Sequence, residues 1–172
     1  MNQPENPLIA QSDRSVLLEV DHPAYEDARD ALARFAELEK SPEHVHTYRI
    51  SPLSLWNAAA AGLDANAILE ALERFSKYEI PQNISREIEE FIDRYGQVRL
   101  VKRDDLLVLE SDDTVLVTEI AGQKSVIPFL EGQLDANSLQ IGSQYRGHIK
   151  QALIKLGFPV EDLAGYVAGI PP

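Results

Sequence analysis

The sequence contains no cysteine, and only one methionine and one tryptophan, among its 172 residues. Without cysteine the chain has neither disulfide bonds nor thiolate ligands, which excludes a disulfide scaffold and a cysteine-ligated zinc site. It also lacks a run of about 18 apolar residues, the length that a membrane-spanning helix needs. Its first residues lack the basic start and apolar run of a secretory signal. Since 44% of the residues are hydrophobic, we expect a folded, cytoplasmic protein with an apolar core.

The motifs of nucleotide hydrolysis are missing as well. A phosphate-binding P-loop needs Gly-Lys followed by Ser or Thr, and the sequence has no Gly-Lys pair. It has no Asp-Glu pair of the kind with which helicases orient water and magnesium. A Gly-x-Ser-x-Gly elbow is absent, and the carboxylates show no spacing typical of a hydrolase. We therefore expect no catalytic residue, no bound metal, and neither an ATP nor a magnesium site in this chain.

The charge is strongly negative and unevenly distributed. Sixteen Lys and Arg stand against 28 Asp and Glu, a net charge of -12. Residues 1–140 hold 13 basic and 26 acidic residues, whereas residues 141–172 hold three and two. Because such a field repels phosphate polymers, tight nucleic-acid binding by the whole surface is disfavoured, and any positive patch must be local.

Two aromatic patterns permit a functional and a structural interpretation. His44 and His46 lie two residues apart, as in some metal sites, but only two further histidines and no cysteine accompany them. The structural interpretation is therefore favoured. Trp56 is suited to stack on a base, yet it falls on an apolar helix face, which favours packing in the core.

Local signals predict the elements of the first half. Apolar runs at residues 8–10 and 15–20 predict a hairpin, and a proline-led start at residues 21–23 predicts a helix that ends near residue 39. An extended segment is expected at 46–50. Three short helices follow, with starts at Ser51-Pro52, Asp64 and residue 83, because Ser and Asp cap free N–H groups.

After Gly96 the apolar period changes to two. Alternation at residues 98–100 and 106–109 around a turn predicts a hairpin, and three helices followed by a hairpin is the order of a winged helix. Residues 112–123 stay ambiguous, because Val115 and Val117 favour a strand whereas Asp112-Asp113 favours a helix cap. Strands are expected at 126–130 and 139–141, then a helix from Ser143 to Gly157 and a short helix from 159.

The third helix of the tri-helical unit does not resemble a DNA-reading helix. Between residues 83 and 95 it carries two arginines against four carboxylates, a sum of -2, whereas a recognition helix needs donors for phosphates and bases. Better candidates for contact with the DNA backbone lie at the wing and on the last helix. They are Arg94, Arg99, Lys102 and Arg103, then Arg146, Lys150 and Lys155. The alternative for both groups is a solvated face.

Several stretches closely resemble the N-terminal region of XPB-family (xeroderma pigmentosum type B) helicases of the bacterial type. They are PLIAQSDRSVLLEV, SPEHVHTYRISPLSLWNAAAAGL, ILEALERFSKYEIPQN and IDRYGQVRLV. The later stretch HIKQALIKLGFPVEDLAGYVAG resembles the segment that precedes the first motor domain in bacterial members. The resemblance implies an ATP-dependent 3'-to-5' DNA translocase of excision repair, whose N-terminal region includes a damage-recognition-like domain and docking surfaces. The motor domains of that family have no counterpart in this sequence.

The resemblance also implies particular roles and partners. It makes the HTYRIS-to-GL block a scaffold and docking region, with Tyr48, Ser51, Leu55 and Trp56 as candidates, and it favours a helix at 112–123. The implied partners are the helicase motor domains in cis, a repair nuclease or other repair proteins, and weakly bound, non-specific DNA.

Together these signals predict an α+β protein. A hairpin, a helix and a winged-helix-like unit occupy residues 1–111, and a small α/β segment occupies residues 112–172. We expect a non-catalytic module of a repair helicase, with a free-standing protein-interaction module as the alternative.

Overall fold

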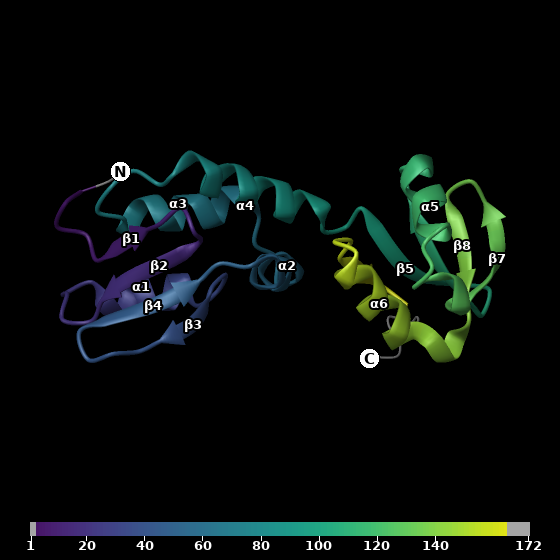
Figure 1. The fold of residues 1–172 in the computed structure, drawn as a ribbon, viewed down its shortest axis with the longest axis horizontal. Coiled ribbons are helices and arrows are strands. Elements are labelled where there is room, and N and C mark those ends of the chain that lie inside the picture. Colours follow the sequence, from purple (N-terminus) through teal and green to yellow (C-terminus); the bar gives the residue numbers. More distant parts are fainter. Residues whose placement is uncertain (1–2, 165–172) are drawn as a thin grey trace. The chain divides into compact units, whose positions relative to one another are not determined.

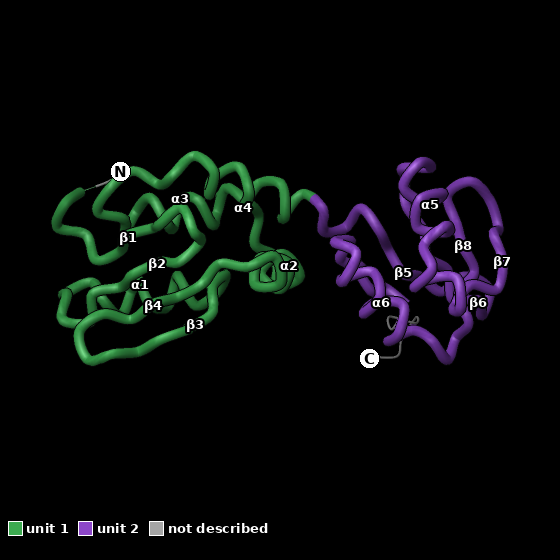
Figure 2. The backbone as a smooth tube through the Cα atoms, in the orientation of Figure 1, with its two compact units in different colours: residues 1–93 green, residues 94–172 purple. Residues whose placement is uncertain are grey.

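The computed structural model describes residues 3–164, and the chain divides into two compact units, residues 1–93 and 94–172. Figure 2 colours the two units separately. Each unit has its own sheet, its own helices and its own apolar core (Figure 1), which confirms the predicted α+β class. No helix within residues 3–164 has the length and apolar character to cross a bilayer.

The first unit is built on a four-stranded antiparallel sheet of order β1-β2-β4-β3. The predicted hairpin is present, with Ile9 opposite Leu17 in its register. Side chains of β2 alternate between the two faces of the sheet. Val16 and Leu18 are buried on the face toward the core, whereas Leu17 and Glu19 are less buried. The strands are β1 (Leu8–Ala10), β2 (Ser15–Glu19), β3 (Glu37–Lys40) and β4 (Val45–Arg49).

Two helices of the first unit, α2 (Pro52–Ala60) and α3 (Ala65–Phe75), begin at a side chain that caps them. The hydroxyl of Ser51 accepts the N–H of Ser54 at 3.0 Å, and a carboxylate oxygen of Asp64 accepts the N–H of Ala67 at 2.8 Å. Between these helices Gly62 has φ +100°, which glycine adopts most readily. The helices are α1 (Tyr25–Leu32), α2 (Pro52–Ala60), α3 (Ala65–Phe75) and α4 (Gln82–Arg94).

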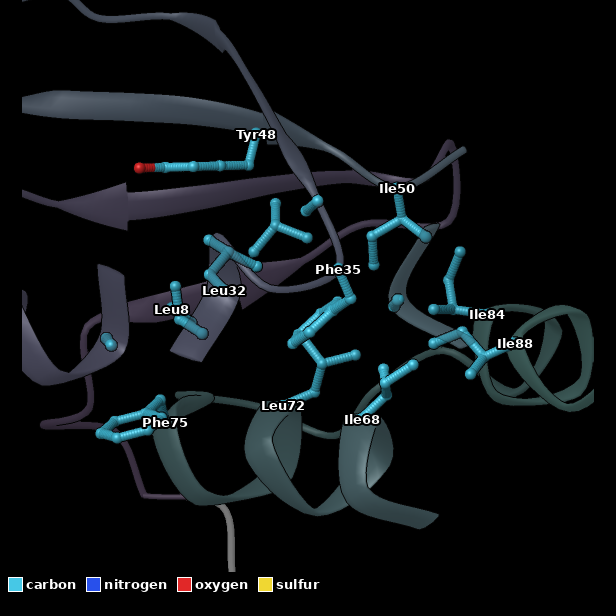
Figure 3. Close-up of a cluster of buried hydrophobic side chains, with 14 of the residues drawn as sticks. Leu8, Leu32, Phe35, Tyr48, Ile50, Ile68, Leu72, Phe75, Ile84 and Ile88 are labelled. Carbon is cyan, nitrogen blue, oxygen red and sulfur yellow. The ribbon is translucent and has the colours of Figure 1, made fainter. Parts of the chain in front are cut away.

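One apolar cluster holds the sheet and helices of this unit together. Figure 3 shows Phe35 against Leu72 of α3, with Ile50 facing Ile84 of α4. The end of α3 is also tied to β1, because the N–H of Lys77 donates to the carbonyl of Leu8 at 2.7 Å. The first unit therefore has a continuous core that none of the predicted DNA-contact residues enters.

The second unit is built on a five-stranded sheet of order β7-β8-β6-β5-β9. All neighbours are antiparallel except β5 and β9. Asp104 and Asp105 both have positive φ at the turn between β5 and β6, as a tight hairpin turn of the primed kind requires. The strands are β5 (Val98–Arg103), β6 (Leu106–Ser111), β7 (Leu130–Asp135), β8 (Ser138–Ile141) and β9 (Val160–Asp162).

Two helices pack on this sheet, α5 (Thr114–Ala121) and α6 (Arg146–Lys155). Leu116 and Ile120 of α5 and Ile149 of α6 belong to the same buried apolar cluster as residues of the sheet. The helix favoured by the resemblance at 112–123 is thus present, and Asp113 caps it. Short 3₁₀ helices precede β7 (Ile127–Phe129) and α6 (Ser143–Tyr145).

Three predicted elements are wrong, and in the first and the last of them tertiary pairing overrides the local signal. The helix expected to reach residue 39 ends at Leu32, and residues 37–40 pair with β4 as an edge strand. The strand expected at 126–130 starts only at Leu130. The short helix expected from 159 is replaced by β9, which adds to the edge of the sheet beside β5.

The β5–β6 hairpin, predicted as the wing of a winged helix, is part of a larger sheet. Because β6 pairs with β8 and β5 with β9, the hairpin occupies the centre of a five-stranded sheet. The observed units divide between residues 93 and 94, whereas the predicted boundary followed residue 111. The end of the predicted second segment, residues 165–172, lies outside the described residues.

Candidate nucleic-acid interface

All seven predicted DNA-contact residues belong to the second unit. Residues 94–172 hold eight basic and ten acidic residues, a sum of -2, whereas residues 1–93 hold eight and 18, a sum of -10. The boundary between the units therefore separates a strongly acidic part from a nearly balanced one. Because its net charge is more negative, the first unit repels DNA more strongly than the second. The second unit is therefore the better candidate for a DNA interface.

Arg99 is held by carboxylates of its own unit. The register of the hairpin sets it opposite Glu110, whose Oε1 lies 3.4 Å from its Nε. Its Nη2 donates to Asp112 Oδ1 at 3.0 Å, and its Nη1 donates to the carbonyl of Gly96 at 3.2 Å. Burial alone would lower the pKa of this guanidinium, but the bonds and charges of Asp112 and Glu110 outweigh burial and raise the pKa above its ordinary value.

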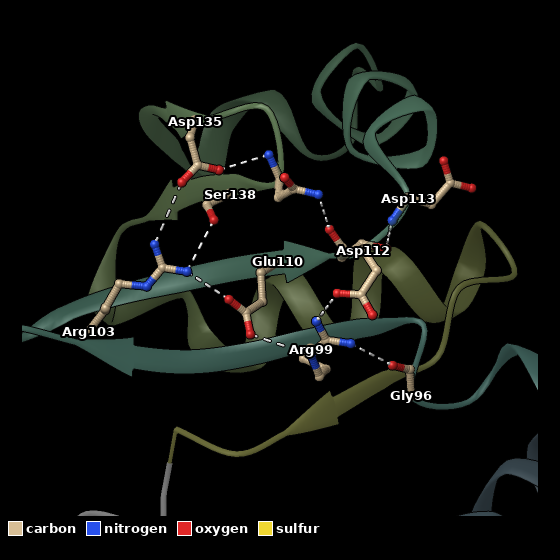
Figure 4. Close-up of polar contacts among 10 residues, drawn as sticks. Gly96, Arg99, Arg103, Glu110, Asp112, Asp113, Asp135 and Ser138 are labelled. Carbon is tan, nitrogen blue, oxygen red and sulfur yellow. Dashed lines mark hydrogen bonds and ion pairs between the residues drawn. The ribbon is translucent and has the colours of Figure 1, made fainter.

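Arg103 shares the same carboxylate. Its Nη2 donates to Glu110 Oε2 at 2.7 Å and to the hydroxyl of Ser138 at 3.2 Å, while its Nη1 lies 3.9 Å from Asp135 Oδ2. Figure 4 shows how Glu110 stands between the two arginines. Two cations thus meet three carboxylates, so this network presents no surplus of positive charge to a phosphate.

Lys102 differs from its arginine neighbours. Among residues 3–164 it has no ion pair within 4.0 Å, and its side chain is exposed. It lines a hollow of about 300 Å³ together with Ser143 and Arg146, which lie at the start of the last helix, and with Asp105. The structure thereby brings together the two groups of cations that are far apart in the sequence.

On α6, Arg146 and Lys150 hold one acid. Arg146 Nε and Lys150 Nζ each lie 2.9 Å from Asp162 Oδ2. Burial would raise the pKa of Asp162, but the hydrogen bonds of Arg146 and Lys150, the charge of Lys150 and the backbone N–H of Ala164 together outweigh burial and hold the pKa below the ordinary value of 3.8. The pairing fixes β9 to the helix. Lys155, at the other end of α6, is exposed and has no ion pair in the described part of the chain, and Arg94 is exposed at the end of α4.

The candidate docking residues of the HTYRIS-to-GL block lie inside the first unit. Tyr48, Leu55 and Trp56 are 5%, 1% and 6% exposed, and Ser51 caps α2. The indole N–H of Trp56 donates to the carbonyl of Phe91 at 2.8 Å, and the two rings meet edge to face. Core packing of Trp56 is confirmed. These side chains form a scaffold, and docking by this block requires other, exposed residues.

The two histidines of the His-Val-His pattern contact different neighbours. His44 Nδ1 lies 2.7 Å from Asp21 Oδ2, and the His46 ring meets Tyr25 edge-on. Both histidines therefore have structural contacts of their own.

Sequence reasoning named the cations but missed the acids that hold them. Glu110 and Asp162 are charged residues in strands, and only the strand register and the β9 pairing show which cations they meet. An aromatic group formed by Phe129, Tyr145 and His148 was also missed, although Tyr145 and His148 lie three residues apart at the start of a predicted helix.

Comparison with known proteins identifies the class first. A family model described as "Helicase conserved C-terminal domain" matches residues 8–135, so the chain contains a domain of a helicase family. It is 48% identical over 166 residues, 96% of this chain, to the DNA 3'-5' helicase XPB of Mycobacterium tuberculosis, and 46% identical over the same length to that of Kineococcus radiotolerans. The chain belongs to the XPB-type helicase family, which confirms the resemblance.

A eukaryotic relative with a shorter matched stretch is also found. The general transcription and DNA repair factor IIH helicase/translocase subunit XPB of Drosophila melanogaster is 36% identical over 105 residues, 61% of this chain and 13% of that protein. The chain spans 30% of the length of the two bacterial relatives. Its N-terminal position within such longer proteins stays a prediction.

Proposed function

We propose that this chain is a non-catalytic module of a cytoplasmic, ATP-dependent 3'-to-5' DNA repair helicase, and that it positions the motor domains on distorted DNA. The observation that carries the proposal is the 48% identity over 96% of the chain to a protein named as a DNA 3'-5' helicase. The sequence has no Gly-Lys pair, so ATP and magnesium belong to motor domains joined to this module in cis. A repair nuclease or other repair proteins are the partners proposed for its remaining surface.

Within the module, the second unit is the part that contacts DNA. Its charge is nearly balanced, whereas the first unit sums to -10. Lys102 and Lys155 are exposed and lack carboxylate partners among residues 3–164. Since the arginines of the sheet are already paired, these two lysines are better placed to neutralise phosphates than Arg99 or Arg103. Two contacts of this kind give weak, non-specific binding.

A titration of forked DNA at several salt concentrations tests this function. We expect weak binding whose affinity falls as salt rises, and a further loss in the double variant Lys102→Ala and Lys155→Ala. Lys40→Ala, which removes an exposed lysine of the first unit, is the matched control and is expected to change little. If the affinity for forked DNA changes neither with salt concentration nor in the double variant, a DNA role for this unit is contradicted.

A second candidate function is protein docking without DNA. The charge of -10 on residues 1–93 favours it for the first unit, because such a surface repels DNA but suits a basic protein. Failure of the chain to bind forked DNA at low salt would favour this candidate.

A further inference from the structure

A hollow on the second unit lies beside the start of α6. It has a volume of about 560 Å³, within the range of about 300–1,000 Å³ that is typical of small-molecule sites. Its lining includes Ser125, Phe129, Gly147, His148, Gln151 and Lys155. Two residues bring aromatic rings, two bring small polar groups and one brings a positive charge.

The two aromatic rings that line this hollow, those of Phe129 and His148, also meet the ring of Tyr145. The centroid of Phe129 lies 5.0 Å from that of Tyr145 and 5.6 Å from that of His148, and Tyr145 and His148 are 5.7 Å apart. Phe129 and Tyr145 are partly buried and pack on the core of the unit, which fixes their positions. His148 is exposed. A rigid pair of rings with an exposed third member is a surface on which a flat heterocycle stacks.

The charge of the hollow is unusual for this chain. The sequence has 28 acidic residues, yet none of the residues that line the hollow is a carboxylate. Lys155 is exposed and has no ion pair among residues 3–164, in contrast to Arg99, Arg103, Arg146 and Lys150. A cation left without an acid beside stacked rings suits a ligand that joins an aromatic base to a phosphate.

Gly147 keeps the hollow open. It lies in the first turn of α6, where a glycine costs helix stability relative to alanine. A Cβ added there would meet nothing within 4 Å, so the protein's own packing does not demand the glycine. Because Gly147 lines the hollow, a large side chain at this position is expected to occupy part of its space.

We propose that this hollow binds an unpaired base of a DNA strand, stacked on Phe129 and His148, with Lys155 at the adjoining phosphate and Gln151 at the base edge. The proposal rests on the proposed DNA-contact function and names the group that the second unit recognises. It also gives a physical reason for a preference for distorted DNA, because a base that is already unpaired avoids the cost of unstacking.

Two labelled strands with equal numbers of phosphates test the proposal in the 172-residue chain. One is a short oligothymidine, and the other carries abasic sugars in place of the bases. We expect about tenfold tighter binding of oligothymidine, since stacking on an aromatic side chain contributes a difference of this order. Gly147→Leu, which fills the space, and His148→Ala are expected to abolish this preference. His148→Phe should retain it, because the ring face remains.

The lysines separate charge from stacking. Lys155→Ala should weaken binding of both strands to a similar degree, whereas Lys40→Ala should affect neither. His148 and Lys155 are exposed, so their variants report binding even if Gly147→Leu fails to fold. If the unmodified chain binds the two strands equally, the proposal of a base-binding hollow is overturned, whereas the proposed DNA-contact function is not. Binding of neither strand, even at low salt, overturns both.

Discussion

At the scale of single residues, the carboxylates decide which cations are available to a partner. Glu110 accepts hydrogen bonds from both Arg99 and Arg103, and Asp162 holds Arg146 and Lys150. Four of the seven predicted DNA-contact residues are therefore engaged inside the unit. The sequence predicts cations from their type alone, but a cation's partner depends on strand register and on chain segments that are distant in sequence.

Glu110→Gln is expected to raise the affinity for forked DNA several-fold at low salt and to lower stability. The change removes the charge that Arg99 and Arg103 share, which frees their positive charge for phosphates. It also weakens a bonded pair whose acid is only 23% exposed, at a cost of about 1 kcal/mol. Anisotropy titration and urea unfolding measure the two effects.

Glu119→Gln is the matched control for this prediction, because Glu119 is exposed on α5 and makes no ion pair in the described part of the chain. It changes the net charge by the same amount. An equal rise in affinity for the two variants would mean that only the total charge matters, which contradicts a specific release of the arginines.

Asp162→Asn is expected to destabilise the second unit by about 1–2 kcal/mol at neutral pH, because it leaves Arg146 and Lys150 without their acid. The pKa of Asp162 is lower in the folded chain than its ordinary 3.8. Its contribution is therefore fully present above 3.8 and is lost as pH falls through the lower, folded-state value. Urea unfolding at neutral pH and below pH 3.8 checks this. A difference between variant and parent that does not shrink in acid would contradict it.

At the scale of elements, the helix ends marked by a capping side chain or by a glycine were the most predictable features. Ser51, Asp64 and Asp113 cap the helices that follow them, and Gly62, Gly96 and Gly157 adopt positive φ after a helix. These signals involve only neighbouring residues, so the sequence contains them in full. The hairpins β1–β2 and β5–β6 were predictable for the same reason.

Elements that depend on distant partners were not predictable. Every residue of β3 (Glu37–Lys40) is exposed, and the strand has no apolar alternation, so only its pairing with β4 makes it a strand. β9 forms where three residues reach β5 across more than fifty positions of sequence. The five-stranded sheet was missed because nothing local to residues 98–111 shows that both edges of the hairpin are paired.

Ser51→Ala is expected to destabilise the first unit by about 1 kcal/mol. The Ser51 hydroxyl accepts the N–H of Ser54, and the Ser54 hydroxyl accepts the N–H of Ser51 at 2.9 Å, so the change leaves the first turn of α2 without one acceptor. The cost is measured by urea unfolding followed through Trp56, the sole tryptophan. Ser41→Ala, at an exposed loop position, is expected to stay within about 0.5 kcal/mol. Equal effects of the two variants would contradict the capping role.

At the scale of the whole molecule, the two units differ in charge. The first unit has a buried scaffold and a sum of -10. The second has the stacked rings, a sum of -2, and Lys102 and Lys155, which have no ion pair among residues 3–164. The family was predictable from stretches spread along the chain, whereas the boundary between the units was not, because the hairpin follows the three helices in sequence but joins the other sheet.

Hydrogen–deuterium exchange of the chain with and without forked DNA tests the central claim most directly, because it reports on every backbone amide in one measurement. DNA is expected to slow exchange in residues 98–103 and 125–155 and to leave residues 8–93 unchanged. Slower exchange confined to residues 8–93 would place the interface on the acidic unit and contradict the account.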